Sequence, residues 1–206
     1  MKEDYDLAAI IYDPLLFLAL KPVRKAVAKK LFEYKDKKIL DLCCGTGNQL
    51  KILAENGFTD LHCLDLSDSM LNIARKSACK MKIYCEDATE TNFDDESFDL
   101  IIISFAIHEK DKITQKNLMN ETYRLLKKDG AVLIVDFVFD DQTSFFSKMI
   151  IRTVERMAGR EHYNNFKNYI HENGLQGIMR DEQFKLKSYN RKLLKGVTIS
   201  IYNKIA

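Results

Sequence analysis

A short apolar run, a glycine-rich turn and a helical pattern follow one another early in the chain, and this succession restricts the fold most. Residues 39–43 form the apolar run, which contains Asp41, and Gly45 and Gly47 follow it. Glycines directly after a buried strand let the backbone turn sharply and approach a ligand closely. Residues 48–55 have helical apolar spacing, and the free first-turn amides of such a helix favour an anionic group such as a carboxylate.

Strand and helix patterns then alternate along the chain. We expect further strands at residues 61–66, 81–85, 98–104 and 131–137, a helix capped by Ser67 or Asp68, and a helix over 115–126 that ends in the basic turn 127–130. Two period-2 segments near residues 184–189 and 197–202 predict an antiparallel hairpin. The pattern indicates an α/β, Rossmann-like doubly wound fold whose seven-stranded sheet is mostly parallel and carries a C-terminal antiparallel hairpin.

The chain length and the residue types limit the organisation and the function. A chain of 206 residues predicts one domain, 1–206, divided into a helical cap (1–36), a cofactor-binding core (37–140), a helical substrate or lid insertion (141–180) and an edge hairpin (181–206). A net charge of +2 does not argue for nucleic acid. Five cysteines without a CxxC pair argue against a disulfide framework and a zinc site, so we expect no metal. Because neither a signal peptide nor a membrane-spanning run is visible, we expect a cytoplasmic protein.

An acid at the end of the second strand points to a nucleoside ligand. Asp65 lies 18 residues after Gly47, where a carboxylate can accept hydrogen bonds from both ribose hydroxyls. A dinucleotide fingerprint requires a third glycine where this chain has Leu50, and no P-loop ending is present. Asp41, close to the turn, instead suits a cationic ligand with an ammonium or sulfonium group and disfavours a pyrophosphate.

These segments resemble the motifs of the class I S-adenosylmethionine-dependent methyltransferases, in order. The resemblance covers roughly residues 5–140 and is closest to the small-molecule, quinone and phospholipid branch. It implies S-adenosylmethionine as cofactor, S-adenosylhomocysteine as product and a small-molecule or lipid-like acceptor. The cofactor-binding residues that it implies are Tyr5, Tyr12, Asp41, Cys43, Gly45, Thr46, Gly47, Asp65, Leu66, Met70, Glu86, Asp87, Ala88, Ser104 and Phe105.

Other residues are candidates for catalysis of the methyl transfer and for binding of the methyl acceptor. His108 follows the fourth strand, where a neutral imidazole can take a proton from the acceptor; packing is the alternative. Tyr12, together with Tyr5, is a second candidate, because an aromatic ring can lie over the sulfonium. Glu161, His162 and Tyr163 belong to the insertion and are candidate substrate residues; an ordinary aromatic helix is the alternative.

A basic segment near the N-terminus raises the question of a membrane. Residues 21–38 hold eight basic residues against two acids, beside an apolar stripe at helical spacing formed by Leu16, Leu20, Val23, Val27 and Leu31. The 15–38 helix suits an acidic membrane surface. The favoured interpretation is a helix that packs this stripe on the sheet.

Other functions remain open at this stage. A nucleic-acid methyltransferase is the first alternative, although no proline follows Pro22 and the enzymes of this kind that act on exocyclic amines carry a proline-proline-aromatic motif. A non-catalytic protein that binds the cofactor and regulates a partner is the second. A nicotinamide-dependent oxidoreductase is the third and is weakened by Leu50. The acceptor atom and the oligomeric state cannot be predicted.

Overall fold

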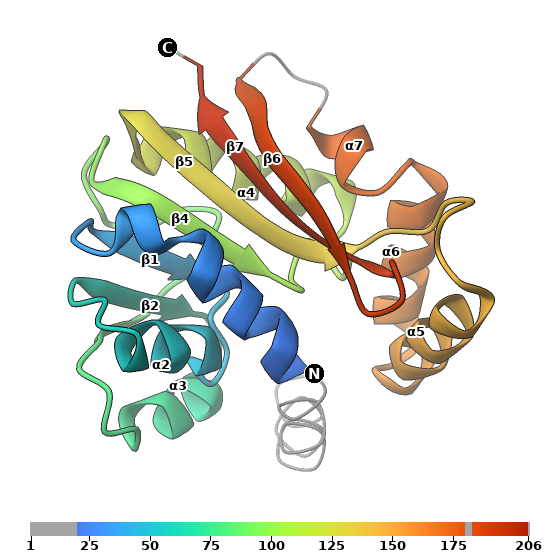
Figure 1. Ribbon diagram of the computed structural model, residues 1–206, viewed down its shortest axis with the longest axis horizontal. Helices are drawn as coiled ribbons and strands as arrows, with labels where there is room; N and C mark the ends of the chain where they lie inside the picture. The colour runs from blue at the N-terminus through green and yellow to red at the C-terminus, as the bar shows by residue number, and fades with distance from the viewer. Residues whose placement is uncertain (1–19, 180–182, 206) are drawn as a thin grey trace. The chain divides into compact units, whose positions relative to one another are not determined.

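The computed structural model describes residues 20–179 and 183–205, which divide between Ala88 and Thr89 into a first and a second compact unit (Figure 1). The strand order over these residues is β3-β2-β1-β4-β5-β7-β6. This is the mixed, mostly parallel seven-stranded arrangement predicted from the sequence. The division of a single domain into cap, core, insertion and hairpin stays a prediction.

The first unit alternates strands and helices. Its elements are η1 (Phe32–Tyr34), β1 (Ile39–Leu42), α2 (Asn48–Glu55), β2 (Leu61–Asp65), α3 (Asp68–Arg75) and β3 (Lys82–Cys85). The three strands are parallel, with β2 between β1 and β3. Their register aligns the carboxyl ends of β1 and β2, so that the turn after β1 and the end of β2 lie together. The strands and helices predicted between residues 39 and 85 are present within one or two residues, whereas the helix predicted over 15–38 ends at residue 30 and is followed by η1.

The helical segment 20–30 packs its apolar stripe inside the first unit. Val23, Val27 and Leu31 are almost completely buried, and Gln49 on α2 donates to the carbonyl of Arg24. These three residues therefore do not offer an apolar face to a membrane, as the favoured interpretation expected. Leu16 lies outside the described residues. None of the helices in the described ranges has the length and apolar character that crossing a membrane requires.

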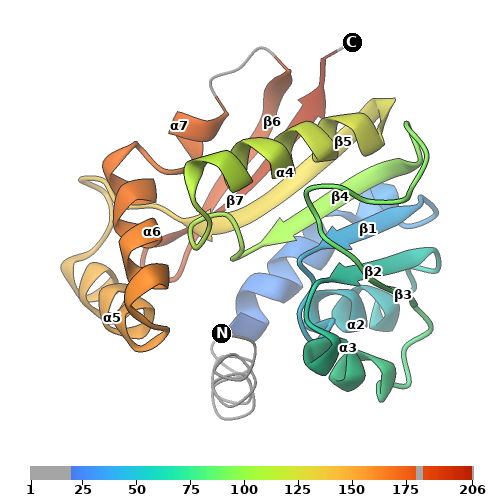
Figure 2. The same ribbon diagram turned by 180° about the vertical axis from the view of Figure 1, so that it is seen from behind.

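The second unit combines parallel and antiparallel strands with helices. Its elements are β4 (Phe98–Ser104), α4 (Lys112–Leu125), β5 (Leu126–Phe137), α5 (Phe145–Met157), α6 (Arg160–His171), α7 (Leu175–Ile178), β6 (Phe184–Lys192) and β7 (Val197–Lys204). β4 and β5 are parallel, whereas β7 pairs antiparallel with both β5 and β6. Figure 2 shows α4 lying across the face of β4 and β5. The predicted hairpin is confirmed, and α5, α6 and α7 lie within residues 141–180.

The end of α4 differs from its prediction. The expected basic last turn at 127–130 belongs to β5, because the helix ends at Leu125 and Leu126 already has extended dihedral angles (φ −74°, ψ 134°). Leu126 pairs with Phe98, which starts the β4–β5 ladder early. The helix also begins before the predicted residue, since Asp111 caps it by accepting from the amides of Ile113 and Thr114.

One expectation about the cysteines is wrong. Cys44 and Cys63 form a disulfide, with their Cα atoms 5.6 Å apart. The β1–β2 register places Cys63 opposite Asp41, and the amide of Cys44 donates to the carbonyl of Leu64. Strand pairing thus brings together two cysteines that no sequence spacing marks as a pair.

Candidate functional site

The turn after β1 is built from left-handed residues. Cys43, Gly45 and Gly47 have φ values of 60°, 54° and 70°. A Cβ on Gly47 would lie 3.3 Å from Cβ of Ala74 and from Sδ of Met81, whereas a Cβ on Gly45 would meet nothing within 4 Å. Gly47 is therefore needed for close packing, and Gly45 leaves open space beside the turn. Gly47 is also the N-cap of α2, so the turn leads directly to the free amides of that helix.

Asp65 holds this turn from the end of β2. Its Oδ2 accepts from the backbone N–H of Gly45 at 2.8 Å, and its Oδ1 accepts from the N–H of Ser67 at 2.9 Å. The carboxylate is only partly buried, and each oxygen keeps a second lone pair for hydroxyl donors. The fixed carboxylate fits the predicted contact with a ribose.

Asp41 is a completely buried acid in β1. Its Oδ1 finds no hydrogen-bond partner within the described part of the chain. Burial and then the charge of Asp65 raise the pKa of Asp41 to about 8, while Arg24 opposes the shift. A buried carboxylate with an unused acceptor atom fits a cationic ligand group, because such a group would supply both the missing charge and the missing donor.

The surface beside Asp65 suits an aromatic base. Leu66 follows the acid directly and is 64% exposed, although apolar side chains of this kind are usually covered. Met70 on α3 is half-buried, and the hydroxyl of Ser67 caps this helix. The exposed leucine next to a ribose-type acid is consistent with the predicted adenine contact.

The other predicted cofactor residues of this unit lie around the turn and at the end of β3. Thr46 is buried and accepts from the side-chain amide of Asn48. Glu86, Asp87 and Ala88 follow β3 as half-buried, exposed and buried residues, respectively. The structure thus collects the predicted set from Asp41 to Ala88 in one unit. Tyr5 and Tyr12 lie outside the described residues.

Ser104 is the last residue of β4 in the second unit, and Phe105 follows it. The buried hydroxyl of Ser104 has no partner within the described ranges, and Phe105 has a φ of 55°. The Phe105 amide donates to the carbonyl of Val135 at 2.7 Å. A non-glycine residue held in this left-handed conformation is a form of strain that concentrates at functional sites.

His108 lies between two buried carboxylates. Its Nδ1 is 2.6 Å from Oδ1 of Asp136, and its Nε2 is 3.3 Å from Oε2 of Glu155. Burial by itself lowers the pKa of His108, but the two carboxylates outweigh it and raise the pKa to about 10. With both ring nitrogens engaged, the imidazole has no free lone pair at neutral pH. The geometry does not offer the neutral base that the sequence position suggested.

His162 belongs to the same cluster and the neighbouring candidates do not. Its Nε2 is 2.6 Å from Oε2 of Glu155, and its Nδ1 is 3.5 Å from Oε2 of Glu109. Glu161 is exposed, and Tyr163 stacks on Phe166. Of the three predicted substrate residues, only His162 therefore contacts the group formed by His108 and Glu155.

Sequence reasoning missed Asp136, Glu155 and Glu109. Asp136 is completely buried and also accepts from the amides of Ile107 and His108. An acid inside the apolar run 131–137 was a usable signal for a functional or structural role. Glu155 had no such signal, because it resembles any other charged residue of an amphipathic helix.

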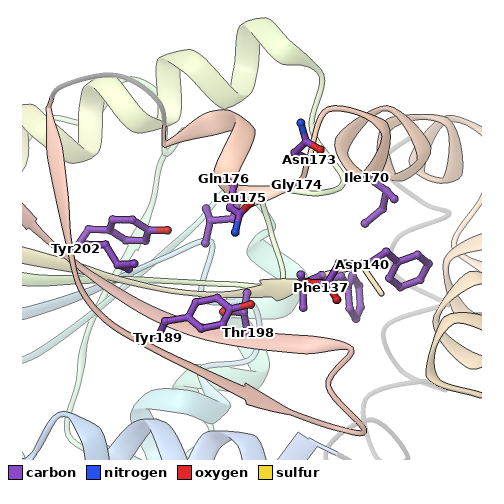
Figure 3. Close-up of a pocket in the computed structure, with 13 residues that line it drawn as sticks. Phe137, Asp140, Ile170, Asn173, Gly174, Leu175, Gln176, Tyr189, Thr198 and Tyr202 are labelled. Carbon is purple, nitrogen blue, oxygen red and sulfur yellow. The ribbon is translucent and has the colours of Figure 1, made fainter. Parts of the chain in front are cut away.

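The second unit also contains a pocket between α7 and the β6–β7 hairpin. Tyr189 and Tyr202 from the hairpin and Leu175 from α7 line it, together with Phe137 at the end of β5 (Figure 3). Its volume is about 120 Å³. Ligand pockets usually measure roughly 300–1,000 Å³, so this one is too small for a drug-sized molecule as it stands.

Comparison with known proteins gives matches over much of the chain. Residues 39–130 match a family described as a methyltransferase domain. The ubiquinone/menaquinone biosynthesis C-methyltransferase of Campylobacter jejuni is 24% identical over 173 residues, which cover 78% of this chain and 72% of that protein. The demethylmenaquinone methyltransferase of Leptospira interrogans is 36% identical over 106 residues, covering 48% of this chain and 42% of that protein.

A solved structure has the same fold. A SAM-dependent methyltransferase from Thermotoga maritima superposes with a TM-score of 0.70 at 20% identity, covering 99% of this chain and 100% of that chain. The predicted fold class is thus confirmed. The family match begins with β1 and contains every cofactor candidate from Asp41 to Phe105.

Proposed function

We propose that this chain, which is a class I S-adenosylmethionine-dependent methyltransferase, methylates a lipid-like acceptor of the quinone type. The cofactor and the general reaction follow from the family match and its relatives. The quinone acceptor is inferred from two relatives that are named for ubiquinone or menaquinone biosynthesis and for demethylmenaquinone. A cytoplasmic location belongs to the same proposal.

The observation that carries the cofactor assignment is the buried, unpartnered oxygen of Asp41 close to a glycine turn. In this proposal Asp41 faces the cationic part of S-adenosylmethionine, Asp65 accepts from its ribose, and the amides at the start of α2 face its carboxylate. The exposed side chain of Leu66 packs against the adenine. The bound cofactor supplies a methyl group already activated on its sulfonium sulfur.

The protein's contribution to the reaction is mainly positioning. An in-line attack needs the acceptor atom to be held close to the methyl carbon and aligned with it, and orientation of this kind supplies ~7–11 kcal/mol in well-ordered systems. We assign no proton-abstracting role to His108, because carboxylates occupy both of its ring nitrogens. A quinol acceptor needs little help, since its hydroxyl groups make the ring electron-rich.

An apolar surface on α5 supports a lipid-like acceptor. Phe145, Phe146, Met149 and Ile150 are all about half exposed or more. Four large apolar side chains on neighbouring turns are unusual on a protein surface and are typical of contacts with apolar ligands, lipids or partners. They lie in the helical insertion that was expected to form a lid.

The experiment has two stages, so that cofactor and acceptor are tested separately. Thermal unfolding is first measured with S-adenosylmethionine, S-adenosylhomocysteine and NAD. A ligand at 100 times its dissociation constant stabilises by ~2.7 kcal/mol, which raises the Tm of a domain of this size by roughly 5–10 °C. We expect this rise with the two adenosyl compounds only. A rise with NAD alone would refute the cofactor assignment.

Methyl transfer is then followed with radiolabelled S-adenosylmethionine. The acceptors are demethylmenaquinol with a short isoprenoid tail, total tRNA and duplex DNA, and the Asp65→Ala variant serves as the inactive control. Label in the quinol product confirms the proposal. Label in nucleic acid, or none in any acceptor by a chain that binds the cofactor, would refute the quinone assignment and favour one of the two alternatives.

A further inference from the structure

We infer that His108, Glu155 and His162 form a binding site for one divalent transition-metal ion such as Zn²⁺. One ligand atom from each of these side chains lies within 4.8 Å of the other two. The inference concerns the second unit alone and does not depend on the proposed methyl acceptor.

The three side chains converge from separate elements. His108 follows β4, Glu155 lies on α5, and His162 lies on α6. Both imidazole Nε2 atoms face the same atom, Oε2 of Glu155, at 3.3 Å for His108 and 2.6 Å for His162. Two ligand atoms of a tetrahedral zinc ion with bonds of about 2.0–2.1 Å lie about 3.3 Å apart. The first pair already has that spacing, and the second needs only a small side-chain movement.

The second nitrogen of each imidazole faces another carboxylate. Nδ1 of His108 lies 2.6 Å from Asp136, and Nδ1 of His162 lies 3.5 Å from Glu109. A metal-binding histidine almost always donates its other N–H to a carboxylate, a carbonyl or water, which fixes the orientation of the ring. Each imidazole therefore faces Glu155 with one ring nitrogen and a second carboxylate with the other. Ordinary ion pairing does not require this arrangement.

The ligand types and their burial select the kind of ion. Two imidazoles and one carboxylate suit zinc, iron, nickel or copper, whereas Mg²⁺ and Ca²⁺ prefer oxygen ligands alone. The side chains of His108 and Glu155 are 3% and 5% exposed, and that of His162 is 14% exposed. The buried side chains of His108 and Glu155 shield their side of the site from water, and His162 lies closer to the surface. Three protein ligands leave a coordination position for water or another small ligand.

Binding of the ion would link α5 and α6 to the residues that follow β4. α5 and α6 contribute one ligand each, and the third ligand follows β4, whose neighbour β5 supplies Asp136. The ion displaces the proton on Nε2 of His108, and metal–ligand bonds replace the two contacts of Glu155 with the imidazoles. We therefore expect a stabilised insertion as well as a bound ion.

The test uses the full-length chain without a histidine tag. After treatment with a chelator and dialysis, the chain is titrated with Zn²⁺ by calorimetry and with Co²⁺ by visible absorption. One equivalent of ion per chain is expected, with Co²⁺ bands of a low-coordinate N/O site and a rise in Tm. His162→Gln removes the most exposed ligand and should abolish this binding. Glu109→Gln should weaken it by about 10–100-fold, as changes behind a metal ligand do.

Matched controls come from the same helix. His171→Gln and Glu161→Gln change exposed residues of α6 that lie outside the cluster, and both should bind the ion like the unmodified chain. Circular dichroism verifies that each variant is folded. Absence of binding at micromolar Zn²⁺, or equal binding by His162→Gln and His171→Gln, would overturn the inference and leave the cluster as a network of hydrogen-bonded ion pairs.

Discussion

The backbone N–H of Gly45 donates to the carboxylate of Asp65 over 2.8 Å, so the residue expected to bind the ribose also fixes the glycine turn. The second oxygen of Asp65 accepts from the amide of Ser67, which caps α3. One side chain thus couples the turn after β1 to the start of the next helix. Loss of this carboxylate should affect the shape of the turn and cofactor binding together.

Replacement of Asp65 by alanine should weaken S-adenosylmethionine binding by about 100-fold or more. Hydrogen bonds to charged groups contribute about 1.5–3 kcal/mol each, and the ribose would lose two of them. Isothermal titration calorimetry measures the change. Asp36→Asn alters an exposed acid of the same unit and should bind like the unmodified chain. An affinity for Asp65→Ala within a factor of three of that control would contradict the assigned role.

Asp41 predicts an unusual dependence of stability on pH. The pKa of its carboxyl group is raised from 3.8 to about 8 in the folded chain. Between these values the folded chain binds more protons than the unfolded one, so the free energy of unfolding falls as pH rises through this window. Asp41→Asn removes the titration, and the cofactor-free variant should be more stable than the unmodified chain at pH 8, by up to several kcal/mol at ~1.36 kcal/mol per unit of pKa shift.

The same substitution should weaken cofactor binding, because a neutral amide cannot balance a cation. Chemical unfolding at pH 5 and pH 8, with and without S-adenosylmethionine, separates the two effects. The stability advantage of Asp41→Asn should be small at pH 5 and large at pH 8, and it should shrink when the cofactor is added. A variant that is less stable than the unmodified chain at both pH values would show that Asp41 has a structural role instead.

Alanine at Gly45 and at Gly47 should have different consequences, although both positions have a positive φ. A left-handed conformation costs a non-glycine residue roughly 1–2 kcal/mol, and both variants carry this cost. Gly47→Ala adds the crowding against Ala74 and Met81, whereas Gly45→Ala points a methyl group into open space. We therefore expect Gly47→Ala to lose more Tm than Gly45→Ala. For each degree of Tm lost, Gly45→Ala should lose more cofactor affinity than Gly47→Ala.

Differential scanning fluorimetry and calorimetry on the two variants test this contrast. Each kcal/mol lost corresponds to about 2–4 °C in a domain of this size. Equal Tm values for the two variants would mean that the contacts of Gly47 with Ala74 and Met81 relax without cost. Full cofactor affinity in Gly45→Ala would mean that the cofactor does not approach this turn.

Local patterns were sufficient for most elements of the fold. The apolar run of β4 and the glycines after β1 are local signals, and the predicted strand 98–104 agrees with the structure at both ends. The end of α4 was predicted wrongly, because the sequence after Leu125 resembles a C-terminal cap. Pairing of Leu126 with Phe98 draws the chain into β5 instead, and only the tertiary structure provides that partner.

The candidate site residues likewise divide into those that local patterns mark and those that only long-range pairing brings together. Asp41 and Asp65 each lie in a local pattern of a strand followed by a turn, and the sequence marked both as candidates. The cluster around His108 depends on long-range pairing, because the β4–β5 register brings Asp136 beside residues 107 and 108 while α5 and α6 supply Glu155 and His162. The expectation of no metal rested on cysteine spacing only, which does not address the proposed site of two imidazoles and a carboxylate.

Reduction of the Cys44–Cys63 disulfide should lower the stability of the chain by about 3 kcal/mol. The bridge closes a loop across 19 residues that contains the glycine turn and α2, and a loop of this length restricts the unfolded chain by about that amount. The expected loss of Tm in a reducing buffer is roughly 6–12 °C. The double variant Cys44→Ala/Cys63→Ala should be insensitive to the reductant, whereas Cys79→Ala, which changes a free cysteine, should respond like the unmodified chain. Equal Tm values with and without reductant in the unmodified chain would show that the bridge contributes nothing to stability.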